Sequence, residues 1–391
     1  MALRCITILF RDQPAGTLYE TAAGGTRFVY NADWGETIGC SLPRAEGEHA
    51  WSAGIHPFFQ HLTAEGWLRG QQARAGHVQA QDDFGLLSLF GADCIGAVGV
   101  VPATEGDLQP LRETVGAADA VVTGRRTVSG VQKKLLAFHD GERFRPAERL
   151  DQPATHIAKF NPDGEPTLVR NENLSLSLAR EVLGDQEVTR ATIGTVEGID
   201  GVALLVERFD RRDGTKLRLE DFAQVLRKPR GLDFKGKYQS SYEEAASVVR
   251  DFSARPVIDL ARFLRRIVFS VLIGDADAHL KNFSLLERPE GLRLSPAYDQ
   301  LNTTIYDNYD QDAALEINGR LRALVSIDRS TLTELGRAIG LPSAAANRVV
   351  ASIQSGWERS TTLALGPAID PQDFRARYAE LVTNNAARIF A

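Results

Sequence analysis

Cysteine is scarce in this chain. The three cysteines, Cys5, Cys40 and Cys94, are odd in number and far apart. This spacing argues against a disulfide framework or a cysteine zinc site and is typical of a protein in a reducing cytoplasm. Positive charge is not in excess either, because 51 acidic residues outnumber 45 lysines and arginines. This balance argues against coating nucleic acid as the main activity, although a local basic patch remains compatible with it.

Long apolar runs are missing as well. The most apolar stretch, residues 85–102, is interrupted by Asp93 and several glycines, and the N-terminus "MALRCITILFRDQPAG" lacks the layout of a signal peptide. We therefore expect a cytoplasmic protein with no membrane partner.

Hydrophobic residues are plentiful in the 391-residue chain, at 43%, which is ample for two or three domains or subdomains. Residues 1–105 carry the alternating patterns "ITILF" and "TRFVY", a Gly24-Gly25 turn and a helical pattern over 56–71, which predict a small α+β subdomain. Residues 106–206 predict strands such as "ATHIAKFNP" and "GVALLVERFD" with one helix over 171–183, typical of a nucleotide-holding lobe. Residues 207–391 have helical periodicity, as in "RLEDFAQVLR" and "VIDLARFLRRIVFSVLIG". The predicted fold class is α+β, with an N-terminal subdomain, a β-rich lobe and an α-helical lobe.

The segment "LIGDADAHLKNFSLL" encloses many polar residues in an apolar frame. It places Asp277 five positions before Asn282, the spacing that phosphoryl transfer uses for a base and a magnesium ligand. A second carboxylate for the metal follows in "LRLSPAYDQL" at Asp299. The alternative is a solvated turn at "DADAH" with Asp299 as a helix cap.

Two upstream segments contain the other groups that a nucleotide site needs. Lys159 lies in the alternating strand "ATHIAKF", and Glu172 lies at a helix start, where it would pair with Lys159 as in protein kinases. The segment "LLVERFDRR" ends an apolar strand at Glu207, as a hinge that meets adenine and ribose would. A surface lysine, a first-turn glutamate and a strand edge are the alternatives.

In this order, the segments resemble the HipA-type serine/threonine kinases of bacterial toxin–antitoxin systems over nearly the whole chain. The resemblance is carried by "GADCIGAVGVVP", "TVSGVQKKL", "THIAKF", "NENLSLSLARE", "VERFDRR", "LRLEDFAQVL", "KYQSSYEE", "GDADAHLKNFSLL", "LSPAYDQL" and "ALEINGR". It implies a two-lobed, protein-kinase-like fold with an extra N-terminal subdomain. The parts would be residues 1–105, 106–206 and 207–391.

The resemblance also implies a role for each site residue. Asp277 would be the catalytic base, with Asp275 outside the matching spacing and therefore structural or supporting. Further implied roles are magnesium binding by Asn282 and Asp299, phosphate binding by Lys159, adenine binding by the backbone of Glu207 and Phe209, ribose binding by Asp210, and contact with the nucleotide phosphates by His279 and Lys281.

The segment "TVSGVQKKL" would be the loop that covers the nucleotide phosphates. Small Ser129 and Gly130 would let backbone N–H groups approach ATP, and Lys134 would reach it. No Walker motif is present. In the family, a serine of this loop is autophosphorylated and switches the enzyme off; here the hydroxyl positions are Thr127 and Ser129, so the modified residue stays open. Ordinary turn chemistry is the alternative.

The function implied is transfer of the ATP γ-phosphoryl group, with Mg²⁺, to a protein hydroxyl by the toxin of a toxin–antitoxin module. The family's precedent for a target is an aminoacyl-tRNA synthetase, and its partner is a helix-turn-helix antitoxin of HipB type, through which DNA would be contacted only indirectly. A small-molecule kinase and a kinase-like co-repressor with weak catalysis remain alternatives. Direct DNA binding through the helix-turn-helix-like segment around Gly340 is a further alternative.

Overall fold

The structure is a computed structural model that describes residues 3–103, 125–127, 132–363 and 373–391. Its contacts divide the chain into two compact units, residues 1–166 with 192–236, and residues 167–191 with 237–391. Helices and sheets are both present, so the predicted α+β class is confirmed. The division itself differs from the three predicted parts, because residues 1–105 share a unit with most of residues 106–206.

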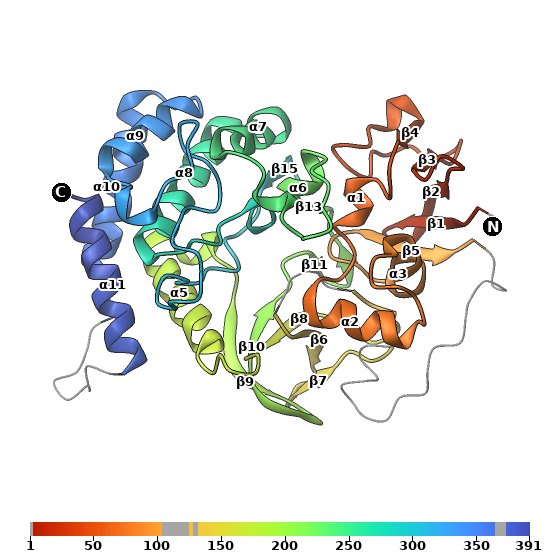
Figure 1. Cartoon of the computed structure of the whole chain (residues 1–391), viewed down its shortest axis with the longest axis horizontal. Coiled ribbons are helices and arrows are strands. Elements are labelled where there is room, and N and C mark those ends of the chain that lie inside the picture. Colours follow the sequence, from red (N-terminus) through yellow and green to blue (C-terminus); the bar gives the residue numbers. More distant parts are fainter. Residues whose placement is uncertain (1–2, 104–124, 128–131, 364–372) are drawn as a thin grey trace. The chain divides into compact units, whose positions relative to one another are not determined.

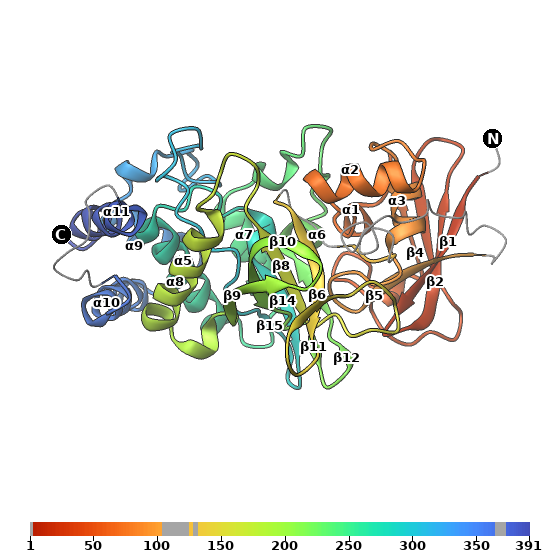
Figure 2. The ribbon, with the colours of Figure 1, turned by 90° about the horizontal axis from the view of Figure 1, so that it is seen from below.

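The first unit begins with a five-stranded sheet in the order β4-β3-β2-β1-β5. Its strands are β1 (Cys5–Phe10), β2 (Gln13–Glu20), β3 (Thr26–Tyr30), β4 (Glu48–Trp51) and β5 (Val98–Pro102). The helices that follow β4 are α1 (Pro57–Gln60), α2 (Gly66–Ala75) and α3 (Asp83–Phe90). Buried Ile6, Ile8 and Phe28 of the sheet form one core with Phe59 of α1 and Phe84 of α3. Figure 2 shows α1 and α3 beside the strands of this sheet.

Strand β2 was missed by the sequence patterns. Pro14 and Gly16 lower the strand propensity of this segment, and the β1–β2 turn contains no glycine. Its residues Arg11 and Asp12 both have positive φ, 47° and 62°, as a tight hairpin turn requires. Gly16 is needed for another reason: a Cβ there would lie 2.3 Å from the carbonyl oxygen of Val29.

The first unit also contains a closed barrel in the order β10-β8-β6-β7-β9. Its strands are β6 (Lys134–His139), β7 (Phe144–Pro146), β8 (His156–Phe160), β9 (Ala191–Val196) and β10 (Ile199–Glu207). The chain then forms β11 (Arg211–Arg212), β12 (Thr215–Lys216), β13 (Leu219–Asp221) and α6 (Phe222–Val225). The helix predicted for "RLEDFAQVLR" is therefore a strand followed by one helical turn, which an Asp221–Gln224 capping box begins.

The second unit is built around α8 (Pro256–Ile273), a largely buried amphipathic helix. The helices that contact it are α5 (Leu168–Leu183), α7 (Tyr242–Phe252), α9 (Arg329–Ala338), α10 (Ser343–Arg359) and α11 (Phe374–Ile389) (Figure 1). The strands β14 (Ser284–Arg288) and β15 (Gly291–Leu294) form an antiparallel hairpin. The helix predicted over 171–183 thus exists as α5, but it packs with the C-terminal helices.

The helix-turn-helix-like segment is the α9–α10 pair, with Gly340 at φ 104° in its turn. Residues Val350, Ile353 and Gly356 bury one face of α10, which packs on α5 and α8. Packing inside the helical unit therefore accounts for this pair. Among the helices of the described ranges, none combines the length and hydropathy that crossing a membrane requires.

Candidate active site

The polar loop begins where α8 ends. Gly274 ends the helix in the left-handed region, at φ 76°, and a Cβ there would lie 2.2 Å from Thr304 Oγ1. The backbone N–H of Thr304 donates to the carbonyl of Gly274 at 3.1 Å. Glycine is thus required at the point where the chain leaves the helix and starts the loop.

Asp275, the residue directly after Gly274, is only 2% exposed. Its Oδ1 accepts the backbone N–H of Asp277 at 2.9 Å, while its Oδ2 has no hydrogen-bond partner. Burial first, and then the charge of Asp277, raise the pKa of Asp275 well above its usual range; Asp299 adds to this effect. The contact with the backbone N–H of Asp277 connects Asp275 to the proposed base, and its supporting role stays a prediction.

Asp277 is the accessible carboxylate of the loop, with 49% of its side chain exposed. Tyr238 donates its phenolic O–H to Asp277 Oδ1 at 2.5 Å, and His279 Nε2 lies 3.9 Å from the same oxygen. The rings of Tyr238 and His279 pack edge to face, with centroids 4.9 Å apart. A half-exposed carboxylate with a fixed backbone and an ordered neighbour is suited to accept a proton from an entering hydroxyl.

Asn282 and Asp299 are brought together by the β14–β15 hairpin. Asn282 Nδ2 lies 3.4 Å from the carbonyl oxygen of Asp299, and the phenol of Tyr298 donates to the carbonyl of Lys281 at 2.7 Å. Asp299 itself has φ 56°, which acidic and amide residues tolerate better than most. Asn282 and Asp299 are therefore close together, and their binding of magnesium stays a prediction.

The Asn282 side chain carries the observation that bears most directly on a metal. It is 3% exposed, and its Oδ1 has no hydrogen-bond partner. A buried amide oxygen without a donor, beside the carboxylate residue Asp299, fits a hard cation such as Mg²⁺. Within the described ranges no group of three or more His, Cys, Asp or Glu side chains could hold a metal. A pair of protein ligands suits magnesium that completes its shell with water and phosphate oxygens.

Buried polar contacts from α8, which the sequence patterns did not reveal, hold the β14–β15 hairpin in place; we call these contacts the brace. Asp259, with a fully buried side chain, accepts from Arg293 Nε at 2.8 Å and from the backbone N–H of Leu294 at 3.0 Å. Arg266 donates to the carbonyl of Ser295, and burial with the nearby Arg262 lowers its pKa to about 9. The brace holds the strand that leads to Asp299. The available signal was a run of charged residues at helical spacing on an otherwise apolar helix.

His279 and Lys281 lie in the same loop. His279 is 5% exposed and precedes the short 3₁₀ helix Leu280–Asn282, while Lys281 is half-buried. Glu172, in α5, is 3% exposed. Its predicted pairing with Lys159 would join the two units and stays a prediction.

In the first unit, Lys134 and Lys159 are direct cross-strand partners on β6 and β8. They are 6% and 5% exposed, and partners at one register share a face of the sheet. Two cationic side chains at one register concentrate positive charge, which suits an anion with several charges, such as a polyphosphate. The two lysines that the sequence analysis assigned to the nucleotide are thus neighbours.

The adenine-binding residues predicted at the strand end lie where β10 leaves the barrel. Glu207 is the last residue of β10 and pairs with His156, and Phe209 is half-buried two positions later. The backbone N–H of Arg208 donates to the carbonyl of Thr155 at 2.8 Å. Their contact with adenine stays a prediction.

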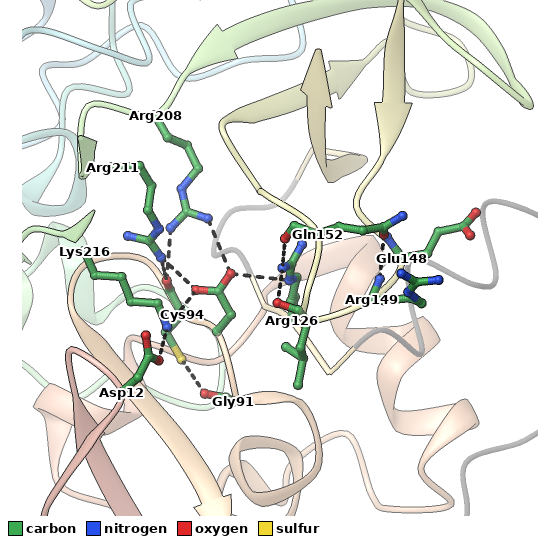
Figure 3. A network of polar contacts seen from close by, with 12 residues as sticks. Asp12, Gly91, Cys94, Arg126, Glu148, Arg149, Gln152, Arg208, Arg211 and Lys216 are labelled. Atoms are coloured by element: carbon green, nitrogen blue, oxygen red, sulfur yellow. Dashed lines mark hydrogen bonds and ion pairs between the residues drawn. The ribbon is translucent and has the colours of Figure 1, made fainter. Parts of the chain in front are cut away.

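Asp210 requires a correction. It is 2% exposed, and its carboxylate accepts from Arg208 Nη2 and Arg211 Nη1, both at 2.8 Å, and from the backbone N–H of Gly96 at 2.7 Å. Figure 3 shows that Arg208 and Arg211 enter a network of polar contacts from the same side. A buried carboxylate with three donors is not available to a ribose hydroxyl. We therefore assign Asp210 to an ion-pair cluster that also contains Asp93.

The ion-pair cluster predicts an acid-sensitive step in unfolding. Burial alone would raise the pKa of Asp210, but Arg208 and Arg211 lower it to about 2. Because the folded pKa lies below the unfolded value, the stabilisation is present above about pH 4 and is lost as the pH falls towards 2; it amounts to about 2 kcal/mol. Replacing Asp210 by Asn should cost about 3 kcal/mol near neutral pH, because the arginines stay buried without their carboxylate.

Urea unfolding between pH 7 and pH 2.5 measures both effects. The matched control is Asp151→Asn, which removes a carboxylate that is 67% exposed and paired with Arg149. We expect this control to be nearly neutral. Equal stability of wild type and Asp210→Asn at pH 7 would contradict the assignment.

The predicted phosphate-covering loop is described only in part. Ser129 and Gly130 lie outside the described residues. Thr127 is 2% exposed, its backbone N–H donates to the carbonyl of Asp93 at 3.2 Å, and its hydroxyl oxygen has no partner. Its neighbour Arg126 donates to the carbonyl of Gln152 (Figure 3). The hydroxyl of Thr127 is therefore buried in this arrangement.

Two domain families match this chain. The family described as the HipA N-terminal domain matches residues 6–101, and the one described as the HipA-like C-terminal domain matches residues 126–360. Together they span the sheet-and-helix region, the barrel and most of the helical unit.

Individual proteins agree with the family matches. Protein Y4dM of Sinorhizobium fredii is 31% identical over 347 residues, 83% of each chain. The serine/threonine-protein kinase toxin HipA of Shewanella oneidensis is 30% identical over 281 residues, 62% of this chain and 61% of its own. A solved complex of HipA, HipB and operator DNA from Shewanella oneidensis contains a chain with 25% identity and a TM-score of 0.73, covering 98% of this chain and 96% of that one. The similarity thus extends over nearly the whole chain.

Proposed function

The chain belongs to the HipA family, and from this premise we propose that it is a kinase that transfers the γ-phosphoryl group of ATP to serine or threonine of a protein. The observation that carries the proposal is the buried, partnerless Oδ1 of Asn282 beside Asp299, in the same loop as half-exposed Asp277. These three residues have the types and spacing of a base and two magnesium ligands.

Each residue has a definite task in this reaction. Asp277 accepts the proton of the acceptor hydroxyl, and Asn282 and Asp299 hold magnesium. Bound magnesium would neutralise charge on the phosphate oxygens. Lys134 and Lys159 bind phosphate oxygens, and the remaining contacts follow the family resemblance: His279 and Lys281 near the phosphates, the Glu207 and Phe209 backbone at adenine, and the Lys159–Glu172 ion pair.

We further propose that the protein is the toxin of a toxin–antitoxin module in the cytoplasm. The support is its family and its likeness to a chain in a complex described as containing HipB and operator DNA. Its partners would be a protein substrate, for which an aminoacyl-tRNA synthetase is the family's precedent, and a HipB-type antitoxin through which it reaches DNA. Autophosphorylation in the phosphate-covering loop, at Ser129 or Thr127, is part of this proposal; the buried hydroxyl of Thr127 favours Ser129.

Incubation of the purified chain with γ-labelled ATP, Mg²⁺ and a bacterial lysate tests this function. We expect label on a small number of lysate proteins, and we expect expression of the wild type, but not of Asp277→Asn, to slow growth. Label on a metabolite in place of protein would favour a small-molecule kinase. Equal growth inhibition by both chains would favour a binding role such as co-repression.

A further inference from the structure

The acceptor position at the proposed base is occupied by a side chain of the protein itself. Tyr238 directs its phenolic O–H at Asp277 Oδ1 with an O···O distance of 2.5 Å. A hydroxyl that is to be phosphorylated must make this contact, since the base has to lie within hydrogen-bond reach of the proton it removes. Asp277 is 49% exposed, so burial does not force the two groups together.

Neighbouring contacts hold Tyr238 in this position. Its ring packs edge to face on His279, with centroids 4.9 Å apart. Two residues later, the backbone is hydrogen-bonded to a separate segment. The N–H of Glu316 donates to the carbonyl of Ser240 at 3.2 Å. The N–H of Tyr242 returns a bond of 3.0 Å to the carbonyl of Glu316. The contact between Tyr238 and Asp277 is therefore part of an ordered arrangement.

We propose that Tyr238 is an intramolecular phosphoacceptor, an inference that rests on the proposed kinase activity. Its Oη attacks the γ-phosphorus of ATP, and the bond from that phosphorus to the β,γ-bridging oxygen breaks. ADP leaves with the electron pair, and the phenolic proton passes to Asp277. The product is phosphotyrosine at position 238, a residue type and a position separate from the loop hydroxyls Thr127 and Ser129.

The new phosphate ester changes the site electrostatically. It carries nearly two negative charges and has no phenolic proton to donate to Asp277. The hydrogen bond that now joins the two side chains is replaced by repulsion between anions. Phosphorylation would thus release the base from Tyr238.

A second tyrosine in the same segment provides an internal control. Tyr242 is 3% exposed and donates its hydroxyl to the carbonyl oxygen of Ala278 at 3.0 Å, so it does not contact the base through that proton. Both tyrosines fall in the tryptic peptide of residues 238–250, between Lys237 and the cleavage site after Arg250. Fragmentation of this one peptide separates their phosphorylation under identical conditions.

The experiment incubates the full-length chain, produced without another kinase, with ATP and Mg²⁺ and follows that peptide over time. We expect phosphate on Tyr238 at least about 100-fold faster than on Tyr242, the typical contribution of a positioned base. The rate constant should not change with protein concentration, because acceptor and base belong to one molecule. Tyr238→Phe should lose this phosphate, and Asp277→Asn should not acquire it.

The failure of this inference is distinguishable from failure of the proposed function. Phosphate transfer to lysate proteins or elsewhere in the chain, with none on Tyr238, would overturn the inference and leave the kinase proposal intact. Equal phosphorylation of Tyr238 in wild type and Asp277→Asn would also overturn it. A chain that binds ATP and Mg²⁺ but transfers phosphate to nothing would overturn both.

Discussion

Replacing Asp277 by Asn should lower the turnover number for phosphoryl transfer about 1,000-fold while ATP affinity changes little, because the lost carboxylate acts on a proton that moves only in the transition state. The substitution preserves the shape of the side chain. Asn retains an oxygen that can accept the phenolic O–H of Tyr238, and the backbone N–H at this position still donates to Asp275. Loss of activity would then not reflect rearrangement of the loop.

Steady-state ADP release and ATP titration measure these two quantities. Asp251→Asn is the matched control, because it makes the same chemical change in α7 at a side chain that is 56% exposed. The control should behave as wild type. An Asp277→Asn chain that retains wild-type turnover would remove Asp277 from the role of base.

Much of the fold followed from local pattern. The alternating burial of β1 and the apolar stripe of α8 are properties of short segments, and both elements were predicted. Strand β2 was not predicted, because Pro14 and Gly16 in its first half are residue types typical of turns, whereas the real turn at Arg11 and Asp12 has no glycine. The barrel depends on pairings between distant strands, which no local pattern specifies.

The residues of the candidate site fall into the same two groups: those that a local motif predicts and those that only the fold brings together. Asp277 and Asn282 lie five positions apart, so a motif sufficed to pair them. Tyr238 lies 39 positions before Asp277, and Asp259 lies 34 before Arg293. Such contacts exist only once the fold brings the segments together, so neither residue was found.

Asp210 was misassigned for a different reason. The end of the strand indicated a hinge. The sequence also has an arginine on each side of Phe209 and Asp210, and these two, Arg208 and Arg211, form ion pairs with Asp210. What the sequence did not provide was the burial of the carboxylate, which makes those ion pairs its dominant interaction.

Removing the charge of Asp299 should abolish the effect of magnesium on ATP binding. Asn is the informative substitution, because the position has φ 56° and Asn adopts this region more readily than Ala. The variant therefore keeps the backbone and loses the carboxylate that would bind the cation. We expect ATP affinity in the presence of Mg²⁺ to fall about tenfold or more, equivalent to about 1.4 kcal/mol.

Calorimetric titration of ATP into wild type, Asp299→Asn and the control Asp251→Asn, each with Mg²⁺ and with EDTA, tests the central claim most directly. The claim is that the loop from Asp275 to Asn282, with Asp299, is a magnesium-nucleotide site. It predicts that Mg²⁺ strengthens ATP binding to wild type and to Asp251→Asn but not to Asp299→Asn. An equal effect of Mg²⁺ on all three chains, or ATP binding that is independent of Mg²⁺ in the wild type, would contradict it.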